Sequence, residues 1–452
     1  MKIAIVGTGY VGLVSAACFA ELGHEVIGVD IDAAKVEMLK EGKSPIYEPG
    51  LEELLKSGLK TGRLTFTTNL LEALPHVKII FSAVATPTGE DFKADLRAVF
   101  IVAETVAKNI NQDIVFVNKS TIPVGTGAEC EKRIAKILKD RGVDYRMPVV
   151  SNPEFLREGM AVPDTMMPDR IIVGMNEKAI GNWPVANSQM PSAKSLMEEL
   201  YRPITRVGKP LIFMSRESSE IVKYASNAFL ATKISFINMM TGLCEVTGAN
   251  VRDVAKGMGL DNRIGPKFLH AGIGYGGSCF PKDVKALLAT GKEYGVPMPI
   301  VEATHNVNQH QRQHFIDRVL TALPKKAHVG IWGLSFKPKT DDMREAPSID
   351  VLEALDQAGH TITAYDPVAT EKAKPHLPAA TTYVDSALEA AKGADALLVL
   401  TEWDEFRGAD LGEVKRAMKG THLFDGRNVY EPKEVSDAGL EYHGIGVPSV
   451  TS

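Results

Sequence analysis

The chain has 452 residues, more than one hydrophobic core usually fills, so its length predicts two or three domains. With 44% hydrophobic and 24% charged residues, it has the composition of a soluble globular protein, which excludes an intrinsically disordered chain. The net charge of -5 gives no electrostatic reason to bind nucleic acid or an anionic membrane, and no apolar run is long enough to span a bilayer.

The four cysteines, at positions 18, 130, 244 and 279, are scattered along the chain without a CxxC pair. In a chain of this size that pattern is typical of free thiols, and we expect a protein of the reducing cytoplasm. The cysteine spacing predicts no metal site.

Residues 1–175 alternate strand-like apolar runs with stretches of helical periodicity, which predicts a parallel sheet with helices on both faces. The predicted strands are KIAIVG, EVIGVD, LTFTT, VKIIFSAVA, DIVFVNKS, MPVVSN and RIIVG. Residues 176–200 accumulate Pro, Ser, Asn and Gly and predict an irregular connector.

A helical pattern without strand signals begins at Glu217 and predicts one long helix, buried on most sides. More helices follow to about residue 323, and the strand–helix alternation then returns in AHVGIWGLSF, HTITAYDP, ADALLVLTEW and THLFDGRN. The predicted fold class is therefore α/β. Two Rossmann-like domains with parallel sheets, residues 1–205 and 324–452, are joined by a central helical domain, residues 206–323, which contains the long helix.

The first predicted strand leads into a glycine-rich turn, Gly7-Thr8-Gly9-Tyr10-Val11-Gly12, which opens a helix. In this strand–turn–helix order, Gly7 permits the tight turn, Gly9 the approach of a pyrophosphate, and Gly12 close packing of helix on strand. The N–H groups and dipole at the helix N-terminus favour the phosphates. The pattern therefore predicts a dinucleotide site.

The second strand ends at Asp30, where a carboxylate can accept hydrogen bonds from the adenosine ribose and would repel a 2′-phosphate. We therefore expect NAD rather than NADP. Asp32 is close enough to be the true ligand, and Asp30 would then be a solvated strand end. Lys35 either approaches the same phosphates or lies on a solvated helix face.

Two later loops also follow strands, at the sheet edge where ligands bind in open α/β folds. One contains Thr86, within residues 84–88, and the other contains Thr121, within residues 119–126. Because Ser, Thr and Pro are common at helix N-termini, either loop can equally be a helix cap.

The stretch from Gly274 to Asp283, GYGGSCFPKD, carries the strongest chemical signal. Its glycines permit a close approach of the backbone to a ligand, and Pro281 is typical of a first helical turn. Cys279 would then precede a helix N-terminus beside Lys282, and both features favour a nucleophilic thiolate. The alternative is an inert, buried cysteine, with Asp283 acting as a helix cap.

On the long helix, Glu220, Lys223 and Asn227 share one face of an otherwise apolar segment. Lys223 and Asn227, one turn apart, can jointly stabilise an alkoxide. The alternative is that this face is simply solvated.

Residues 152–159, NPEFLREG, follow another strand and place Glu154 and Glu158 beside an aromatic residue and a glycine. This composition suits a sugar pocket with a carboxylate available to activate water. The alternative is a strand exit with charged surface residues.

Taken together, GTGYVG, KSTIPVGT, NPEFLREG, the Lys223–Asn227 helix, GYGGSCFPKD and WGLSFKPKTDDMRE resemble the UDP-glucose/GDP-mannose dehydrogenase family over nearly the whole chain. The resemblance implies an N-terminal NAD-binding domain, a central helical region that forms a homodimer, and a C-terminal domain that binds UDP. It implies UDP-glucose as the substrate, and nothing in it suggests nucleic-acid or membrane partners.

The resemblance also implies roles for individual residues, which we state as expectations. The reacting carbon would be surrounded by Cys279, Lys223, Asn227, Asp283, Thr121 and Glu154. The NAD contacts would come from Gly7, Gly9, Tyr10, Val11, Gly12, Asp30, Lys35, Thr86, Thr121, Glu158 and Arg344. The sugar nucleotide would contact Glu154, Phe155, Leu156, Glu158, Lys223, Asn227, Phe268, Gly274, Tyr275, Gly276 and Lys337, with Arg263 reaching over from the second copy of the dimer.

The implied reaction is a two-step, four-electron oxidation of the sugar CH2OH to a carboxylate, through a thiohemiacetal and then a thioester on Cys279. A water held by Asp283 and Thr121 would remove the hydroxyl proton, and Glu154 would assist the final hydrolysis. Two alternatives are the same chemistry on GDP-mannose or a UDP-N-acetylhexosamine, and a non-catalytic NAD-dependent sensor on the same scaffold.

Overall fold

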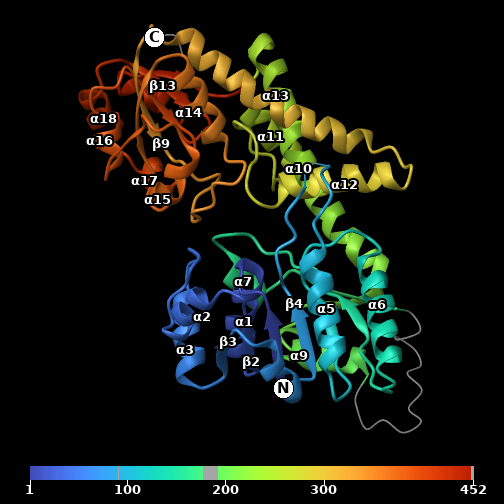
Figure 1. The fold of residues 1–452 in the computed structure, drawn as a ribbon. Helices are drawn as coiled ribbons and strands as arrows, with labels where there is room; N and C mark the ends of the chain where they lie inside the picture. Colours follow the sequence, from blue (N-terminus) through green and yellow to red (C-terminus); the bar gives the residue numbers. More distant parts are fainter. Residues whose placement is uncertain (90, 177–191, 449–452) are drawn as a thin grey trace. The chain divides into compact units, whose positions relative to one another are not determined.

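The computed structural model describes residues 1–89, 91–176 and 192–448. The chain divides into two compact units, residues 1–225 and residues 226–452, and each is considered by itself (Figure 1). Over the described ranges, every helix is too short or too polar to cross a membrane.

The first unit is built on an eight-stranded sheet in the order β3-β2-β1-β4-β5-β6-β7-β8. Its strands are β1 (Lys2–Val6), β2 (Glu25–Val29), β3 (Leu64–Thr67), β4 (Ile79–Ser82), β5 (Val115–Asn118), β6 (Val149–Ser151), β7 (Ile171–Met175) and β8 (Leu211–Ser215). Its helices are α1 (Tyr10–Glu21), α2 (Ala33–Lys40), α3 (Leu51–Lys60), α4 (Leu70–Ala73), η1 (Leu74–His76), α5 (Arg97–Asn109), α6 (Thr126–Asp140), α7 (Ala161–Met166) and α9 (Ala193–Thr205).

Alternate side chains of each strand point to opposite faces, which places apolar cores on both sides of this sheet. Ile3 and Ile5 of β1 pack into the core that contains buried residues of α1, α3 and α9. Ala4 and Val6 pack into the core that contains α5 and α6, and the two groups of helices cover opposite faces of the sheet (Figure 1). The continuous apolar strands predicted from the sequence are thus explained by burial on both faces.

The second unit contains a six-stranded, wholly parallel sheet in the order β11-β10-β9-β12-β13-β14. Its strands are β9 (His328–Trp332), β10 (Thr361–Tyr365), β11 (Thr382–Tyr383), β12 (Ala396–Val399), β13 (His422–Asp425) and β14 (Glu441–His443). Its helices are α11 (Val251–Gly259), α12 (Phe280–Glu293), α13 (Pro299–Ala322), α14 (Pro347–Gln357), α15 (Thr370–Ala373), η2 (Lys374–His376), α16 (Ala387–Ala391), α17 (Asp404–Arg407), α18 (Leu411–Ala417) and α19 (Pro432–Asp437).

The two sheets have the same strand order over six strands, the 3-2-1-4-5-6 order of doubly wound dinucleotide-binding folds. The strand order reverses between β1 and β4, so a ligand is expected at the carboxyl ends of these strands. The first sheet departs from a purely parallel arrangement only at its end, where β7 pairs with β6 in antiparallel fashion and β8 pairs with β7 in parallel. The predicted fold class is confirmed: two Rossmann-like sheets and a helical region between them in sequence.

The long helix α10 (Arg216–Thr247) forms as predicted, with 32 residues. Most of its faces are buried or half-buried, but one is not: Phe236, Met239, Leu243 and Val246 are 42%, 53%, 54% and 81% exposed. These residues are three or four positions apart, so they form one apolar stripe along the helix.

The predicted irregular connector at 176–200 is wrong over its second part. Residues 177–191 lie outside the described residues, but α9 begins at Ala193, and Ser192 caps it by accepting a hydrogen bond from the Ser195 amide. The composition rich in Ser and Pro therefore marked a helix start.

Candidate active site

The glycine-rich turn has the geometry that its three glycines predict. Gly7 has a φ of +92°, and a Cβ there would lie 2.7 Å from the carbonyl oxygen of Ala83. A Cβ on Gly12 would lie 1.8 Å from the Gly7 carbonyl oxygen, so only glycine permits this packing of α1 on the turn. A Cβ on Gly9, by contrast, would meet nothing within 4 Å. This open space at the N-terminus of α1, next to Tyr10 and Val11, fits an approaching pyrophosphate.

Asp30 is buried at the end of β2 and is tied to the glycine-rich turn. Its Oδ2 accepts hydrogen bonds from the Thr8 amide at 2.9 Å, the Thr8 hydroxyl at 2.7 Å and Lys35 Nζ at 2.8 Å. Burial opposes ionisation of Asp30, but Lys35 and Thr8 outweigh it and lower the pKa to about 2. Asp32 instead caps α2 by accepting from the Lys35 amide. The carboxylate nearest the turn is therefore that of Asp30, and Lys35 is its ion-pair partner.

Glu48, which gave no signal in the sequence, links the turn to the loop after β6. The Tyr10 hydroxyl donates to Glu48 Oε2, and the carboxylate also accepts from the amides of Gly159 at 2.6 Å and Ala161 at 2.8 Å. Burial and the Glu48 carboxylate raise the pKa of Tyr10. Glu48 thereby holds the segment that carries Glu154 and Glu158 next to the first turn of α1.

The loops that contain Thr86 and Thr121 are hydrogen-bonded to each other. The Thr86 hydroxyl donates to the carbonyl of Thr121 at 3.0 Å, and the Ser120 hydroxyl donates to the carbonyl of Val84 at 2.7 Å. The N-cap of α6 is Gly125, so neither Ser120 nor Thr121 is the cap of that helix. The loop after β5 is therefore held at the carboxyl edge of the sheet, next to the loop after β4.

Glu220 is hydrogen-bonded inside the protein and is not on a solvated face of α10. Its carboxylate accepts from the amides of Gly125 at 2.7 Å and Gly127 at 3.0 Å and from the Ser151 hydroxyl at 2.8 Å. It is buried, and burial raises its pKa. Glu220 thus satisfies the N-terminal amides of α6 and fixes α10 against the loop after β5.

Lys223, one turn further along α10, is paired with Glu154. Lys223 Nζ lies 2.7 Å from Glu154 Oε1, and the two side chains are 3% and 6% exposed. The Leu156 amide donates to Glu154 Oε2 at 2.6 Å. Burial alone would raise the pKa of Glu154, but Lys223 and this amide lower it. The Glu154 carboxylate is therefore ionised at neutral pH.

A second buried lysine, Lys119, lies in the same region and was not singled out in the sequence. Its Nζ donates to Asn152 Oδ1 at 3.2 Å, and the same oxygen accepts from the Tyr201 hydroxyl at 2.5 Å. Burial and repulsion from Lys223 outweigh the attraction of Glu154 and lower the pKa of Lys119 to about 8. Two ammonium groups therefore share one buried carboxylate.

The aromatic residue of the same loop, Phe155, also faces cations. The guanidinium carbon of Arg170 lies 3.6 Å from the centre of the Phe155 ring, and Lys223 Nζ lies 5.6 Å from it. Glu158 is buried in the same segment. The sequence gave no signal for Arg170, because its partner is 15 residues away and on a different strand end.

In the second unit, Cys279 is the N-cap residue of α12, and Pro281 lies in the first turn as predicted. Cys18, Cys130 and Cys244 are buried, whereas Cys279 is partly accessible. Burial raises the pKa of Cys18 to about 12 and that of Cys130 to about 11. Of the four cysteines, Cys279 is thus the one that is not buried, and it lies at the positive end of a helix dipole.

Asn227 and Asp283 meet beside this helix start. Asn227 Nδ2 donates to Asp283 Oδ2 at 2.6 Å, and Lys282 Nζ lies 3.0 Å from Asp283 Oδ1. Asp283 is 1% exposed, and its side chain binds Asn227 and does not cap α12. The Lys282 ammonium is therefore directed to this carboxylate.

Two of the glycines before Cys279 permit close packing within the unit. A Cβ on Gly276 would lie 2.2 Å from the Glu345 carbonyl oxygen, and one on Gly277 would lie 2.6 Å from the Phe336 ring. The Gly277 amide donates to the Arg344 carbonyl at 2.8 Å. The loop that leads to Cys279 is thus packed on the segment that contains Lys337 and Arg344.

The remaining predicted substrate residues lie around the same loop or on the surface. Tyr275 is buried, and its ring and that of Phe268 contact Phe280 edge-on at 5.7 and 6.1 Å between centroids. Arg263 is exposed and pairs with Asp261 at 2.6 Å. The structure thus gathers Thr86, Thr121, Glu154 and Lys223 in the first unit, and Asn227, Tyr275, Cys279 and Asp283 in the second.

A doubly wound sheet with a GxGxxG turn and a carboxylate at the end of its second strand defines the class of NAD-dependent dehydrogenases. Comparison with known families agrees. The NAD binding domain of the UDP-glucose/GDP-mannose dehydrogenase family matches residues 1–205, its central domain residues 217–310 and its UDP binding domain residues 330–432. The chain belongs to this family, and its cofactor is NAD.

Individual relatives are similar over their whole length. The UDP-glucose 6-dehydrogenase of Rhizobium meliloti is 45% identical, over 99% of this chain and 100% of that protein. That of Pseudomonas aeruginosa is 44% identical, over 99% and 98%. Among solved structures, a UDP-glucose dehydrogenase from Pyrobaculum islandicum has a TM-score of 0.87 at 36% identity, covering 99% of this chain and 98% of that one. UDP-D-ManNAc dehydrogenase from Pyrococcus horikoshii has a TM-score of 0.83 at 26% identity, covering 99% of each.

Proposed function

We propose that this protein oxidises UDP-glucose to UDP-glucuronate with NAD, in two steps and with four electrons. The observation that carries the proposal is the whole-length identity of 45% to a UDP-glucose 6-dehydrogenase, against 26% to the UDP-D-ManNAc enzyme. The residues of both units support the same chemistry. The partly accessible Cys279 at the start of α12 and the buried Lys223 are what an alcohol-to-acid oxidation needs, namely a nucleophile and a cation for an oxyanion.

NAD, when bound, accepts a hydride in each oxidation. Gly7, Gly9, Gly12 and Asp30 are proposed to hold its adenosine and pyrophosphate, because the open face at Gly9 and the ionised Asp30 carboxylate suit those groups. Tyr10, Val11, Lys35, Thr86, Thr121, Glu158 and Arg344 are proposed to complete this site.

Lys223 and Asn227 are proposed to stabilise the alkoxide that forms at C6 when its hydroxyl proton leaves. The two side chains lie one turn apart on the continuous helix α10. The ammonium of Lys223 supplies the charge, and the Asn227 amide supplies a neutral donor. A water held by Asp283 and Thr121 is proposed to take the proton.

Cys279 is proposed to trap the aldehyde. Its thiolate adds to the carbonyl carbon to form a thiohemiacetal, and loss of the second hydride leaves a thioester. Water then hydrolyses the thioester, which restores the thiol and releases the acid, with Glu154 as the carboxylate that orients this water. The tethered aldehyde cannot escape between the two oxidations, which is the advantage of a covalent route.

Two further features are proposed with this function. The apolar stripe of Phe236, Met239, Leu243 and Val246 on α10 suits a second copy of the chain, which would form a homodimer and bring Arg263 to the partner's substrate. A cytoplasmic location is proposed because the four cysteines form no disulfide among the described residues and the substrate is a nucleotide sugar.

The test is to incubate the purified protein with NAD and a panel of sugar nucleotides and to follow NADH. UDP-glucose should yield two NADH per molecule and UDP-glucuronate as the product. A higher kcat/KM with GDP-mannose or a UDP-N-acetylhexosamine would transfer the activity to that substrate. A release of aldehyde with one NADH would contradict the covalent mechanism.

A further inference from the structure

Two histidines and a glutamate meet at the edge of the second sheet, and none of the three is among the residues assigned to NAD or the sugar nucleotide. In the parallel register of β13 and β14, His422 lies opposite Glu441, and Phe424 lies opposite His443. Because alternate residues of a strand share a face, Glu441 and His443 project to the same side as His422. The strands themselves therefore bring three potential metal ligands together.

The spacing of the donor atoms matches a tetrahedral metal ion. His422 Nδ1 lies 3.0 Å from His443 Nε2 and 3.2 Å from Glu441 Oε2, and His443 Nε2 lies 3.4 Å from Glu441 Oε1. Ligand atoms around Zn²⁺, with bonds of about 2.0 Å, are about 3.3 Å apart in a tetrahedron. Each of the three distances is therefore close to one edge of that tetrahedron, with one carboxylate oxygen of Glu441 near each imidazole.

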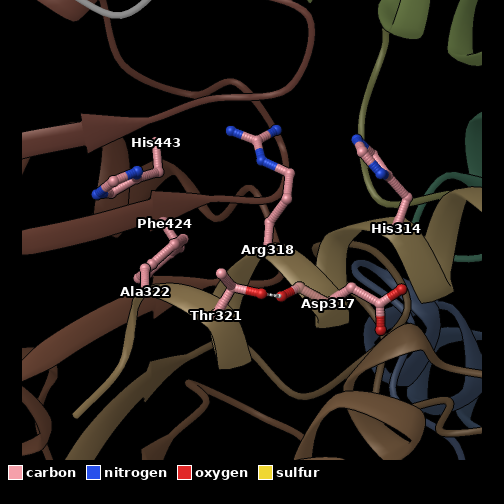
Figure 2. A pocket seen from close by; sticks show the side chains of 7 residues that line it. All are labelled: His314, Asp317, Arg318, Thr321, Ala322, Phe424 and His443. Carbon is pink, nitrogen blue, oxygen red and sulfur yellow. Dashed lines mark hydrogen bonds between the residues drawn. The ribbon is translucent and has the colours of Figure 1, made fainter.

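The surroundings hold one of the ligands in place. The Phe424 ring stacks on the His443 imidazole, with 4.3 Å between centroids and 16° between planes. His443 and Phe424 also line one side of a shallow pocket whose other side is formed by His314, Asp317 and Arg318 of α13 (Figure 2). A fixed imidazole binds a metal with less loss of side-chain entropy than a mobile one.

The nearest cation does not preclude a metal. Arg318 donates to Glu245 Oε1 at 3.0 Å and to the Gly444 carbonyl at 2.9 Å, so a carboxylate already balances its charge. Glu441 supplies a negative charge to the site itself, and two neutral imidazoles with one carboxylate are a common set of ligands for Zn²⁺.

We propose that His422, Glu441 and His443 bind one divalent transition cation, for which Zn²⁺ has the best-matched geometry, and that this ion clamps the edge strand β14 to β13. β14 has three residues, so few backbone hydrogen bonds hold it, and a metal bound only to the folded chain adds to stability by mass action. The cysteine spacing predicts no metal site. The proposed site also matches no sequence motif, because His422 and Glu441 are paired across two strands and His443 lies two positions after Glu441.

The test uses the full-length protein freed of metal with a chelator and titrated with Co²⁺, whose visible absorption reports tetrahedral coordination. We expect one Co²⁺ per chain, displaced by Zn²⁺, and a thermal unfolding midpoint that rises with added Zn²⁺. His443→Gln and Glu441→Gln should each weaken Co²⁺ binding by at least about tenfold, the lower end of what the loss of a ligand or its support costs. The Glu441 side chain is 57% exposed, so the second variant keeps the test valid if the first does not fold.

Two matched controls separate this site from others that could take the ion. His310→Gln removes one of two histidines whose rings stack on α13, and Cys279→Ser removes the accessible thiol. Both variants should bind Co²⁺ as the wild type does. The proposal is overturned if no saturable binding occurs, if binding survives His443→Gln and Glu441→Gln, or if it is lost only in a control. In those cases the two imidazoles are simply hydrogen-bonded to each other.

Discussion

Lys223 Nζ donates to Glu154 Oε1 at 2.7 Å, and both side chains are almost completely buried. The two residues are expected to have different roles, Lys223 with an oxyanion and Glu154 with water, yet in the structure each is the other's counter-ion. The pair holds the Lys223 amino group in one place inside the protein. It also lowers the pKa of Glu154, so this carboxylate is suited to orient water and is a weak base.

The first prediction concerns this pair. Lys223→Met should raise the activation free energy of the first hydride transfer by roughly 2.7–4 kcal/mol, the cost of a lost oxyanion donor. It should also lower the free energy of unfolding by about 3–5 kcal/mol, because Glu154 is left buried without its partner. Rapid mixing with NAD and UDP-glucose measures the first effect, and denaturant unfolding measures the second.

The double variant Lys223→Met with Glu154→Gln provides the control. Removing both charges should restore most of the stability but none of the rate. If the double variant recovered the hydride-transfer rate as well, Lys223 would act only through the fold.

The second prediction is a pH dependence from Lys119, whose pKa of about 8 lies below the ordinary range of lysine. Below pH 8 its charge adds to the positive field near Lys223, and above pH 8 the charge is lost. In a Cys279→Ser background, which isolates the first hydride transfer, the chain with Lys119 should be faster than Lys119→Met at low pH. The ratio of the two rates should fall towards one as the pH rises through about 8.

The free energy of unfolding gives a second readout for Lys119, and it should rise with pH where the rate ratio falls. Between pH 8 and the ordinary pKa of lysine, the unfolded chain binds more protons than the folded one, so the stability of the wild type should rise with pH in that window. Tyr201, Asn152, Glu154 and Lys223 are the polar groups around Lys119, and Lys119→Met should lose this slope. A rate ratio that stays constant with pH would remove Lys119 from the reaction.

The third prediction concerns cofactor choice. Asp30→Ala should weaken NAD binding by about 1–3 kcal/mol, the cost of an unpaired polar partner. It should also relax discrimination against NADP, because Lys35 loses the carboxylate that it binds at 2.8 Å and becomes available to a 2′-phosphate. The ratio of kcat/KM for NAD and NADP measures both effects. Asp32→Asn, which keeps the cap of α2, is the matched control, and a change of selectivity there in place of Asp30 would reassign the role.

Most of the fold was predictable because its strands are buried on both faces. All seven strands predicted in the first unit are confirmed, and most of them are apolar runs between turn residues. The strands that were missed lack this signal: β11 has two residues, β14 is the polar Glu441–His443, and β8 leads into α10 without a loop. The exposed stripe of α10 could not be distinguished from its buried faces, because an apolar surface has the same sequence pattern as an apolar core.

The site was predictable only where its signal is local. The glycine-rich turn and the position of Cys279 before a helix follow from adjacent residues. Contacts between distant segments have no such signal, as in the pairing of Lys119 with Asn152, 33 residues away, and of Gly125 with Glu220, 95 residues away. These contacts decide which charges are buried together, and therefore which pKa values change.

The final prediction is that the second oxidation depends on Cys279. Supplying the 6-aldehyde of UDP-glucose directly as the substrate isolates that step. The wild type should convert it to UDP-glucuronate with one NADH per molecule. Cys279→Ser should still bind UDP-glucose, because the hydroxyl is of similar size. It should oxidise the aldehyde more slowly by at least about 100-fold, since serine forms no comparable nucleophile at neutral pH. Release of free UDP-glucuronate by Cys279→Ser at the wild-type rate would contradict the covalent mechanism.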